Sequence, residues 1–137
     1  MNLNNNLMTL NNEKIELITD CNPEALEIKN SKFCVVVSEC DFEGSSFNRT
    51  NLSGNHFEYS NMSGDYFEEV GLSGAAFERS NMSGAAFDEV NLSGAAFEGC
   101  DFSRAAISDC KLDGMTIDGF NVLELIEFYK NHKENEL

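Results

Sequence analysis

The chain has 137 residues, a length that suits one domain and is too short for two of ordinary size. Its 24 acidic residues outnumber the 9 basic ones, which gives a formal net charge of -15 at pH 7. DNA, RNA and anionic membranes repel so acidic a chain, so direct nucleic-acid binding and membrane binding are excluded from the expected functions. An apolar fraction of 42% is high enough for a folded core.

The sequence also predicts a cytoplasmic location. It has no apolar run of membrane-spanning length, and residues 1–8 lack the basic region and cleavage site of a secretory signal. The cysteines are odd in number and lack the paired spacing of a metal site, which favours reduced thiols. They are Cys21, Cys34, Cys40, Cys100 and Cys110.

The first segment, residues 1–35, does not follow the periodicity of the rest of the chain. Residues 1–12 are rich in asparagine, residues 13–19 alternate as a strand does, and Asn22-Pro23 marks a turn. We expect this segment to be an irregular N-terminal cap for the repeats that follow.

Residues 36–119 contain an internal repeat built on a period of five. Residues 57–76 and 77–96 are identical at 15 of 20 positions, so the repeating unit spans four such periods. A period of five fits neither a helix nor a flat strand, because it scatters the repeated side chains around either element. We therefore predict a square solenoid of about four coils that turns a corner at every period. Every fifth residue is apolar and is expected to point to the common axis: Phe42, Phe47, Leu52, Phe57, Met62, Phe67, Leu72, Phe77, Met82, Phe87, Leu92, Phe97, Phe102, Ile107, Leu112 and Ile117.

This geometry makes further predictions about stacking, filling and corners. Phe57, Phe77 and Phe97 are expected to stack, and a mostly small residue two positions earlier fills the remaining interior, with Asp65 an inward-pointing exception. Ser-Gly corners such as 73-74 predict type II turns, because glycine supplies the positive φ. Corners without glycine, such as 78-79, are expected to be type I or irregular.

The five-residue unit resembles the motif of pentapeptide repeat proteins: a small residue, Asn or Asp, Leu or Phe, and two polar residues. The clearest copies are SNMSG at 60–64 and 80–84, VNLSG at 90–94 and CDFSR at 100–104, and the resemblance covers residues 36–119. It implies an all-β fold, a right-handed quadrilateral β-helix. Some members of this family are implied to mimic DNA in the DNA-binding saddle of type II topoisomerases, which protects these enzymes from quinolones or toxins.

Residues 120–137 predict a C-terminal capping helix and tail. Asn121 can serve as the N-cap with Glu124 reaching back to it, and Lys130 and Lys133 suit the C-terminal end of a helix.

The apolar residues of this helix cover more than one stripe. One stripe could seal the last coil, and the surplus, represented by Phe128 and Tyr129, would then contact another subunit. Related family members often pair through this end, so the resemblance supports a homodimer.

Outward positions predict two acidic walls on opposite sides of the solenoid. Residues 40–119 hold 14 acids and 4 bases, a net charge of -10. Over roughly 20 Å of height this is about one charge per 2 Å, near the one per ~1.7 Å of duplex DNA. The alternative is a surface that serves solubility only. The first wall comprises Glu58, Glu78, Glu98 and Asp118, and the second wall comprises Glu68, Glu69, Asp88, Glu89 and Asp109.

Candidate catalytic residues are sparse, so we predict a non-enzymatic protein without cofactor or metal. His56 and His132 are interpreted as solvated, because one takes an outward position and the other lies in the charged tail. Cys40 and Cys100 are expected about three coils apart in one column, too far for a disulfide between them. Asp65 is either an acid with a perturbed pKa or a carboxylate hydrogen-bonded to backbone or to Ser45.

Two functions remain. The default is a rigid acidic module that binds a protein partner through its walls. The alternative is a DNA mimic that binds a type II topoisomerase such as DNA gyrase. Against the alternative, about four coils span only some six base pairs at ~3.4 Å each. The family's gyrase binders are also longer and often carry a projecting loop.

Overall fold

The computed structural model describes residues 40–133 in full and, before them, the backbone of six short strands. These six strands are β1 (Met8–Asn11), β2 (Lys14–Ile15), β3 (Ile18–Thr19), β4 (Leu26–Lys29), β5 (Lys32–Phe33) and β6 (Val36–Ser38). The later elements are β7 (Ser46–Asn48), β8 (His56–Glu58), β9 (Tyr66–Glu68), β10 (Ala76–Glu78), β11 (Ala86–Asp88), β12 (Ala96–Glu98), β13 (Ala106–Ser108), β14 (Thr116–Ile117), β15 (Phe120–Asn121) and α1 (Val122–Lys133).

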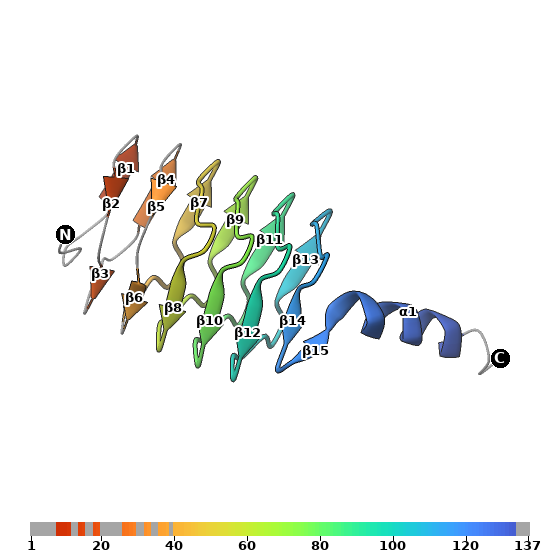
Figure 1. The fold of residues 1–137 in the computed structure, drawn as a ribbon. Coiled ribbons are helices and arrows are strands. Elements are labelled where there is room, and N and C mark those ends of the chain that lie inside the picture. Colours follow the sequence, from red (N-terminus) through yellow and green to blue (C-terminus); the bar gives the residue numbers. More distant parts are fainter. Residues whose placement is uncertain are drawn as a thin grey trace.

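The chain winds as a solenoid in which equivalent strands of successive coils lie side by side. The two large sheets have the orders β1-β4-β7-β9-β11-β13 and β15-β14-β12-β10-β8-β6-β3, and Figure 1 shows them as two rows of short arrows. β2 and β5 form a separate two-stranded sheet. Phe57 pairs with Phe77 and Phe77 with Phe97, all in parallel. Single parallel bridges, such as Asn61 with Asn81, join the coils between the two sheets. The predicted β-solenoid of about four coils is confirmed.

Stacked phenylalanine rings fill the axis of the solenoid. The ring centroids of Phe57 and Phe77, and of Phe77 and Phe97, lie 4.6 Å apart with interplanar angles of 5°. The rings of Phe47 and Phe67 lie 4.8 Å apart, and those of Phe67 and Phe87 lie 4.7 Å apart. This spacing equals the distance between strands, so backbone pairing and ring stacking require the same repeat length.

The Ser-Gly corners follow the expectation. Gly74 has a φ of +67°, and the other corner glycines in this position have similar values, as a type II turn requires. An asparagine side chain supports most of these corners by accepting a hydrogen bond from the backbone N–H of the serine two positions later. The bonds are Ser53 N to Asn51 Oδ1 (3.0 Å), Ser63 N to Asn61 Oδ1 (3.1 Å), Ser83 N to Asn81 Oδ1 (2.9 Å) and Ser93 N to Asn91 Oδ1 (3.1 Å).

The corners without glycine were expected to be type I or irregular, and the structure excludes the type I alternative. Their second residue has a positive φ, for example 48° at Arg79 and 54° at Glu89. A type I turn needs a negative φ there. The backbone pairing of adjacent coils continues through these corners: the N–H of Arg79 donates to the carbonyl of Glu98 at 2.8 Å. This bond helps to hold the left-handed conformation, which is disfavoured for a residue with a side chain.

The two sheets extend into the N-terminal segment that was expected to be irregular. β4 pairs with β7 with Ile28 opposite Phe47, and β3 pairs with β6 with Ile18 opposite Val37. These offsets are one position shorter than the offset from Phe57 to Phe77 in the repeats. A shortened coil breaks the phase of five, which is why the periodicity fades before residue 36. The boundaries 1–35, 36–119 and 120–137 stay a prediction.

Helix α1 is present, but it does not seal the last coil. The N–H of Glu124 donates to Asn121 Oδ1 at 3.1 Å, which confirms Asn121 as the N-cap. Val122 is the buried residue of the helix, and Figure 1 shows the rest of α1 leading away from the end of the solenoid. The expectation that an apolar stripe covers the last coil is therefore wrong for the single chain, and Ile107 of that coil is 37% exposed.

Candidate functional site

The first wall is a ladder of carboxylates in direct register. Glu58 pairs with Glu78 and Glu78 with Glu98 on β8, β10 and β12, so three carboxylates follow one another at the strand spacing of ~4.8 Å. Like charges directly opposite each other on neighbouring strands repel. Asp118 comes directly after β14 and differs from the others, because its Oδ1 accepts a hydrogen bond from the backbone N–H of Gly99 at 2.8 Å.

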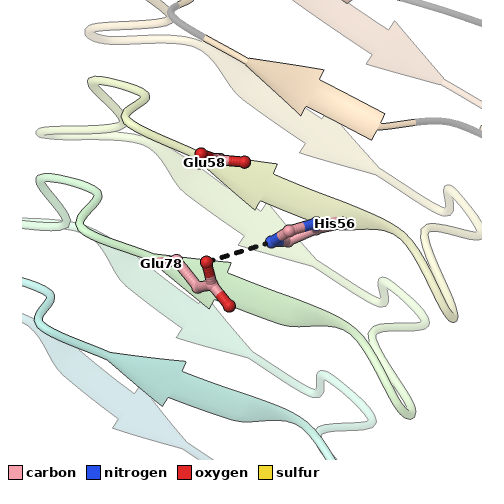
Figure 2. Close-up of side chains that lie close together, drawn as sticks. All are labelled: His56, Glu58 and Glu78. Atoms are coloured by element: carbon pink, nitrogen blue, oxygen red, sulfur yellow. Dashed lines mark ion pairs between the residues drawn. The ribbon is translucent and has the colours of Figure 1, made fainter.

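His56 lies on the same face as this ladder, beside two of its glutamates. His56 and Glu58 are two positions apart on β8, so both side chains point outward from the same side of the strand. The Nε2 atom of His56 lies 3.5 Å from Glu78 Oε2, and Figure 2 shows the ring directed at that carboxylate. The His56 side chain is 35% exposed, so the interpretation of a fully solvated histidine is wrong.

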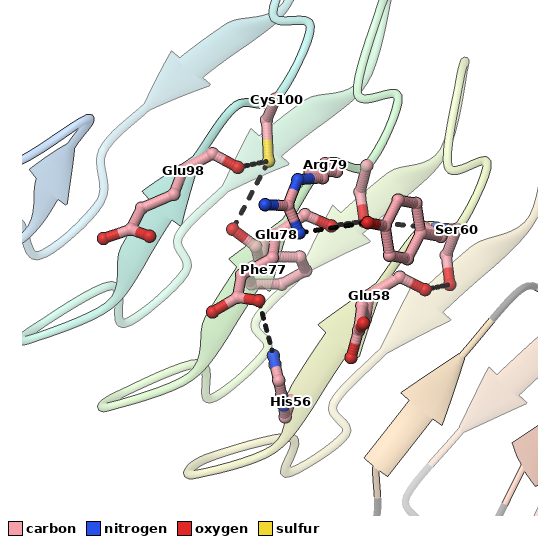
Figure 3. A network of polar contacts seen from close by, with 10 residues as sticks. His56, Glu58, Ser60, Phe77, Glu78, Arg79, Glu98 and Cys100 are labelled. Atoms are coloured by element: carbon pink, nitrogen blue, oxygen red, sulfur yellow. Dashed lines mark hydrogen bonds and ion pairs between the residues drawn. The ribbon is translucent and has the colours of Figure 1, made fainter.

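A second set of contacts runs along the corner next to the first wall (Figure 3). Arg79 donates a hydrogen bond to the Tyr59 hydroxyl at 3.0 Å and lies over its ring, 5.4 Å from the centroid. A shallow hollow of about 300 Å³ lies beside it, lined by Glu78, Arg79, Glu98 and Gly99. Gly99 takes the corner position that Arg79 and Tyr59 hold one and two coils earlier, so its missing side chain opens the hollow.

The carboxylates of the second wall make more hydrogen bonds and ion pairs with neighbouring side chains than those of the first wall. Asn48 donates to Glu68 Oε2 at 2.7 Å, and Arg49 lies 3.4 Å from Glu69 Oε2. The Tyr66 hydroxyl donates to Asp88 Oδ2 at 3.4 Å. Desolvation, followed by the nearby charges of Glu68 and Asp88, raises the pKa of Tyr66. Glu89 and Asp109 have the same corner position as Glu69 in the next two coils.

The cysteines do not form a reactive site in the described residues. Cys100 and Cys110 are free, and burial raises the pKa of both thiols, which keeps them protonated and poorly nucleophilic. The Cys100 thiol donates to the carbonyl of Phe77 at 3.4 Å. Cys40 is disulfide-bonded, so the expectation of reduced cysteines is wrong for this residue.

Residues 38–64 and 66–104 match the family model for pentapeptide repeats, in eight copies. The chain is a pentapeptide repeat protein. The break between the two matched stretches falls at Asp65, which stands where the pentapeptide motif has a small residue.

Three solved structures illustrate the likeness to other pentapeptide repeat proteins. Rfr23 from the cyanobacterium Cyanothece 51142 is 18% identical, over 80% of this chain and 88% of that chain, with a TM-score of 0.39. A trypsin-treated form of QnrB1, a plasmid-mediated fluoroquinolone resistance protein, is 15% identical over 90% and 96% of the two chains, with a TM-score of 0.32. HetL from Nostoc sp. strain PCC 7120, involved in regulating heterocyst differentiation, is 12% identical over 86% and 91%, with a TM-score of 0.23. No curated protein matches the sequence.

Asp65 is the inward-pointing acid of this repeat, and it is 1% exposed. Its Oδ1 accepts a hydrogen bond from the backbone N–H of Ser45 at 2.8 Å, while Oδ2 has no hydrogen-bond partner among the described residues. Burial raises the pKa of Asp65 to about 9, against the opposing effect of the Ser45 hydrogen bond. Both sequence interpretations of Asp65 therefore hold: the carboxyl group is bonded to backbone, and its pKa is strongly perturbed.

We predict that Asp65→Ala stabilises the protein at pH 8 and that this gain shrinks as the pH falls. The folded chain keeps the Asp65 proton up to about pH 9, whereas the unfolded chain releases it above its ordinary value of 3.8. The free energy of unfolding of the wild type therefore falls by about 1 kcal/mol per pH unit between these limits because of this residue. Urea unfolding at pH 5, 6.5 and 8 measures the difference. Asp113→Ala, at an exposed acid, serves as control, and an equal pH slope in Asp65→Ala and wild type would contradict the prediction.

Proposed function

We propose that this pentapeptide repeat protein is a rigid, non-enzymatic module that binds a basic surface of another protein through its acidic walls. The observation that supports this most is the register of Glu58, Glu78 and Glu98, which holds three carboxylates in a row on neighbouring strands. A row of charges whose backbone positions are fixed accelerates association with a basic partner and selects its orientation.

The covered core favours binding over catalysis. The central side chains from Phe42 to Phe97 are each at most 2% exposed, so the middle of the solenoid is filled rather than hollow. The features found on its surface are flat walls and shallow hollows, which suit contact with a broad partner surface. Proteins of this family typically serve as structural or interaction modules.

We expect charge reversal on the first wall to abolish capture of the partner. Wild type and the variant Glu78→Lys/Glu98→Lys would be used as bait in lysate of the host organism at about 50 and 300 mM salt. A specific partner is retained by wild type at low salt, lost at high salt, and lost by the variant, because screening and reversal remove the same attraction.

The matched control for that capture is Glu43→Lys, which changes one exposed charge at a corner away from the walls. Capture of the same proteins by wild type and by the first-wall variant would show that the wall serves solubility only.

The second candidate is a DNA mimic that binds a type II topoisomerase such as DNA gyrase. Its support is the charge density along the axis, since carboxylates at ~4.8 Å intervals on two walls approach the charge spacing of a duplex. QnrB1 is described as a fluoroquinolone resistance protein, but its likeness to this chain carries no weight for the function.

A gyrase supercoiling assay with titrated protein tests this candidate. The mimic should alter supercoiling, or its inhibition by a quinolone, at micromolar concentration, and Glu78→Lys/Glu98→Lys should remove the effect. Unchanged supercoiling and unchanged quinolone sensitivity at about 10 µM would exclude the mimic and leave the general interaction module standing.

The C-terminal end supports a homodimer. Phe128 is 61% and Tyr129 62% exposed on α1, while Ile107 of the last coil is partly bare. The exposed apolar residues of α1 and an uncovered core surface complement each other, so a second copy related by a two-fold axis would cover both in one contact.

We expect light scattering to show a dimer for wild type and a monomer for Phe128→Glu. The substitution introduces a charge where the two copies would bury apolar surface. Tyr59→Glu, at an exposed aromatic on the side of the solenoid, is the control and should leave the dimer intact. A wild type that is monomeric at about 100 µM would remove the proposal.

The cytoplasmic location stays a prediction. Within the part of the chain that the structure describes, no helix has the length and apolar character to cross a membrane. The disulfide at Cys40 counts against a reducing compartment, whereas the free thiols of Cys100 and Cys110 agree with one.

A further inference from the structure

His56, Glu58 and Glu78 bring three metal-ligating side chains together on the first wall. One ligand atom from each residue lies within 4.8 Å of the other two. His56 and Glu58 are held on β8 and Glu78 on β10, two strands that pair in register, so the backbone fixes where the three side chains begin. Figure 2 shows the three side chains on the same outer face.

The environment of the His56 ring distinguishes this group from a mere cluster of acids. Its Nε2 atom is enclosed by protein and has no hydrogen-bond partner among residues 40–133, although a carboxylate oxygen of Glu78 lies 3.5 Å away. An enclosed polar nitrogen without a partner is costly. A cation held between this nitrogen and the two carboxylates would supply the missing partner and also offset the repulsion between Glu58 and Glu78.

The neighbouring outer positions hold no side chain that competes for the two carboxylates. Ala76 lies directly opposite His56 on the neighbouring strand, so a methyl group is all that occupies the adjacent outer position. Arg79, which follows Glu78 in the chain, is turned to the Tyr59 hydroxyl and ring on the neighbouring corner. The next coil repeats the carboxylates as Glu78 and Glu98 but has Ala76 in place of the histidine, so the mixed set occurs at one level of the ladder.

We propose that His56, Glu58 and Glu78 form a binding site for one divalent transition-metal ion, best suited to zinc. An imidazole nitrogen with two carboxylates is a ligand set for zinc and its neighbours, whereas magnesium and calcium take oxygen ligands alone. Tetrahedral zinc with bonds of about 2.0 to 2.2 Å holds its ligand atoms about 3.4 Å apart, so atoms that now lie within 4.8 Å of one another must approach by at most about 1.4 Å. The glutamate side chains are partly exposed and can make this adjustment by rotation. The fourth position remains open to water or to a donor from another molecule.

Zinc titration of the purified full chain, in competition with a fluorescent zinc chelator at pH 7, tests the site. Wild type should bind one zinc ion per chain, and His56→Ala should weaken the binding by at least about tenfold. Glu98→Gln removes a carboxylate from the same ladder but not from the site, so it should change the affinity by less than about twofold. Magnesium at millimolar concentration should not compete.

A transplanted site makes the test independent of folding defects. The double variant His56→Ala/Ala76→His moves the imidazole one coil along, beside Glu78 and Glu98, and should regain zinc binding. Glu98→Gln should then weaken the binding of the double variant by about tenfold. Zinc affinity that is equal in wild type and His56→Ala, or the absence of binding at about 100 µM zinc, would overturn the proposal and leave His56 and Glu78 as an ion pair.

Discussion

The structure depends on the parallel pairing of equivalent positions in successive coils, such as Phe57 with Phe77. This register brings each side chain over its counterpart in the next coil, so phenylalanine stacks on phenylalanine at 4.6 to 4.8 Å and glutamate follows glutamate outside. The same constraint is favourable inside and unfavourable outside, because stacked rings attract while stacked carboxylates repel. The stacked core and the charged walls therefore both follow from the pairing of equivalent positions in successive coils.

The described coils could be derived from the sequence because their physical cause is periodic. Similar residues, such as Phe57, Phe77 and Phe97, recur every 20 residues. A solenoid with 20 residues in each coil stacks them on one another. The five-residue periodicity did not reveal the N-terminal coils, because their length changes. A coil that is one residue shorter places Ile28 opposite Phe47 and interrupts the period of five. The periodicity also failed at corners such as Arg79, because the pairing of adjacent coils, rather than local preference, sets a positive φ there.

The candidate site was also predicted only in part from the sequence. The positions of Glu58, Glu78 and Glu98 on one wall followed from the repeat. The closeness of His56 to Glu78 was missed because the histidine was judged alone, although its alternation with Glu58 and the offset of one coil to Glu78 were both present in the sequence. The exposed course of α1 could not be read from its amphipathic pattern, since such a pattern tells that a helix has an apolar face but not which surface covers it.

The near identity of successive coils has a consequence for how such a molecule can change in length. Removing or duplicating one complete coil would leave every remaining ring, corner and backbone pair facing an equivalent partner. Losing a single residue would instead shorten one coil, as between Ile28 and Phe47, and break the five-residue phase at that place. Growth by whole turns, through copying of a short stretch of gene, is thus the change that this architecture tolerates most readily, and the 15 of 20 matching positions in two adjacent units agree with such a history.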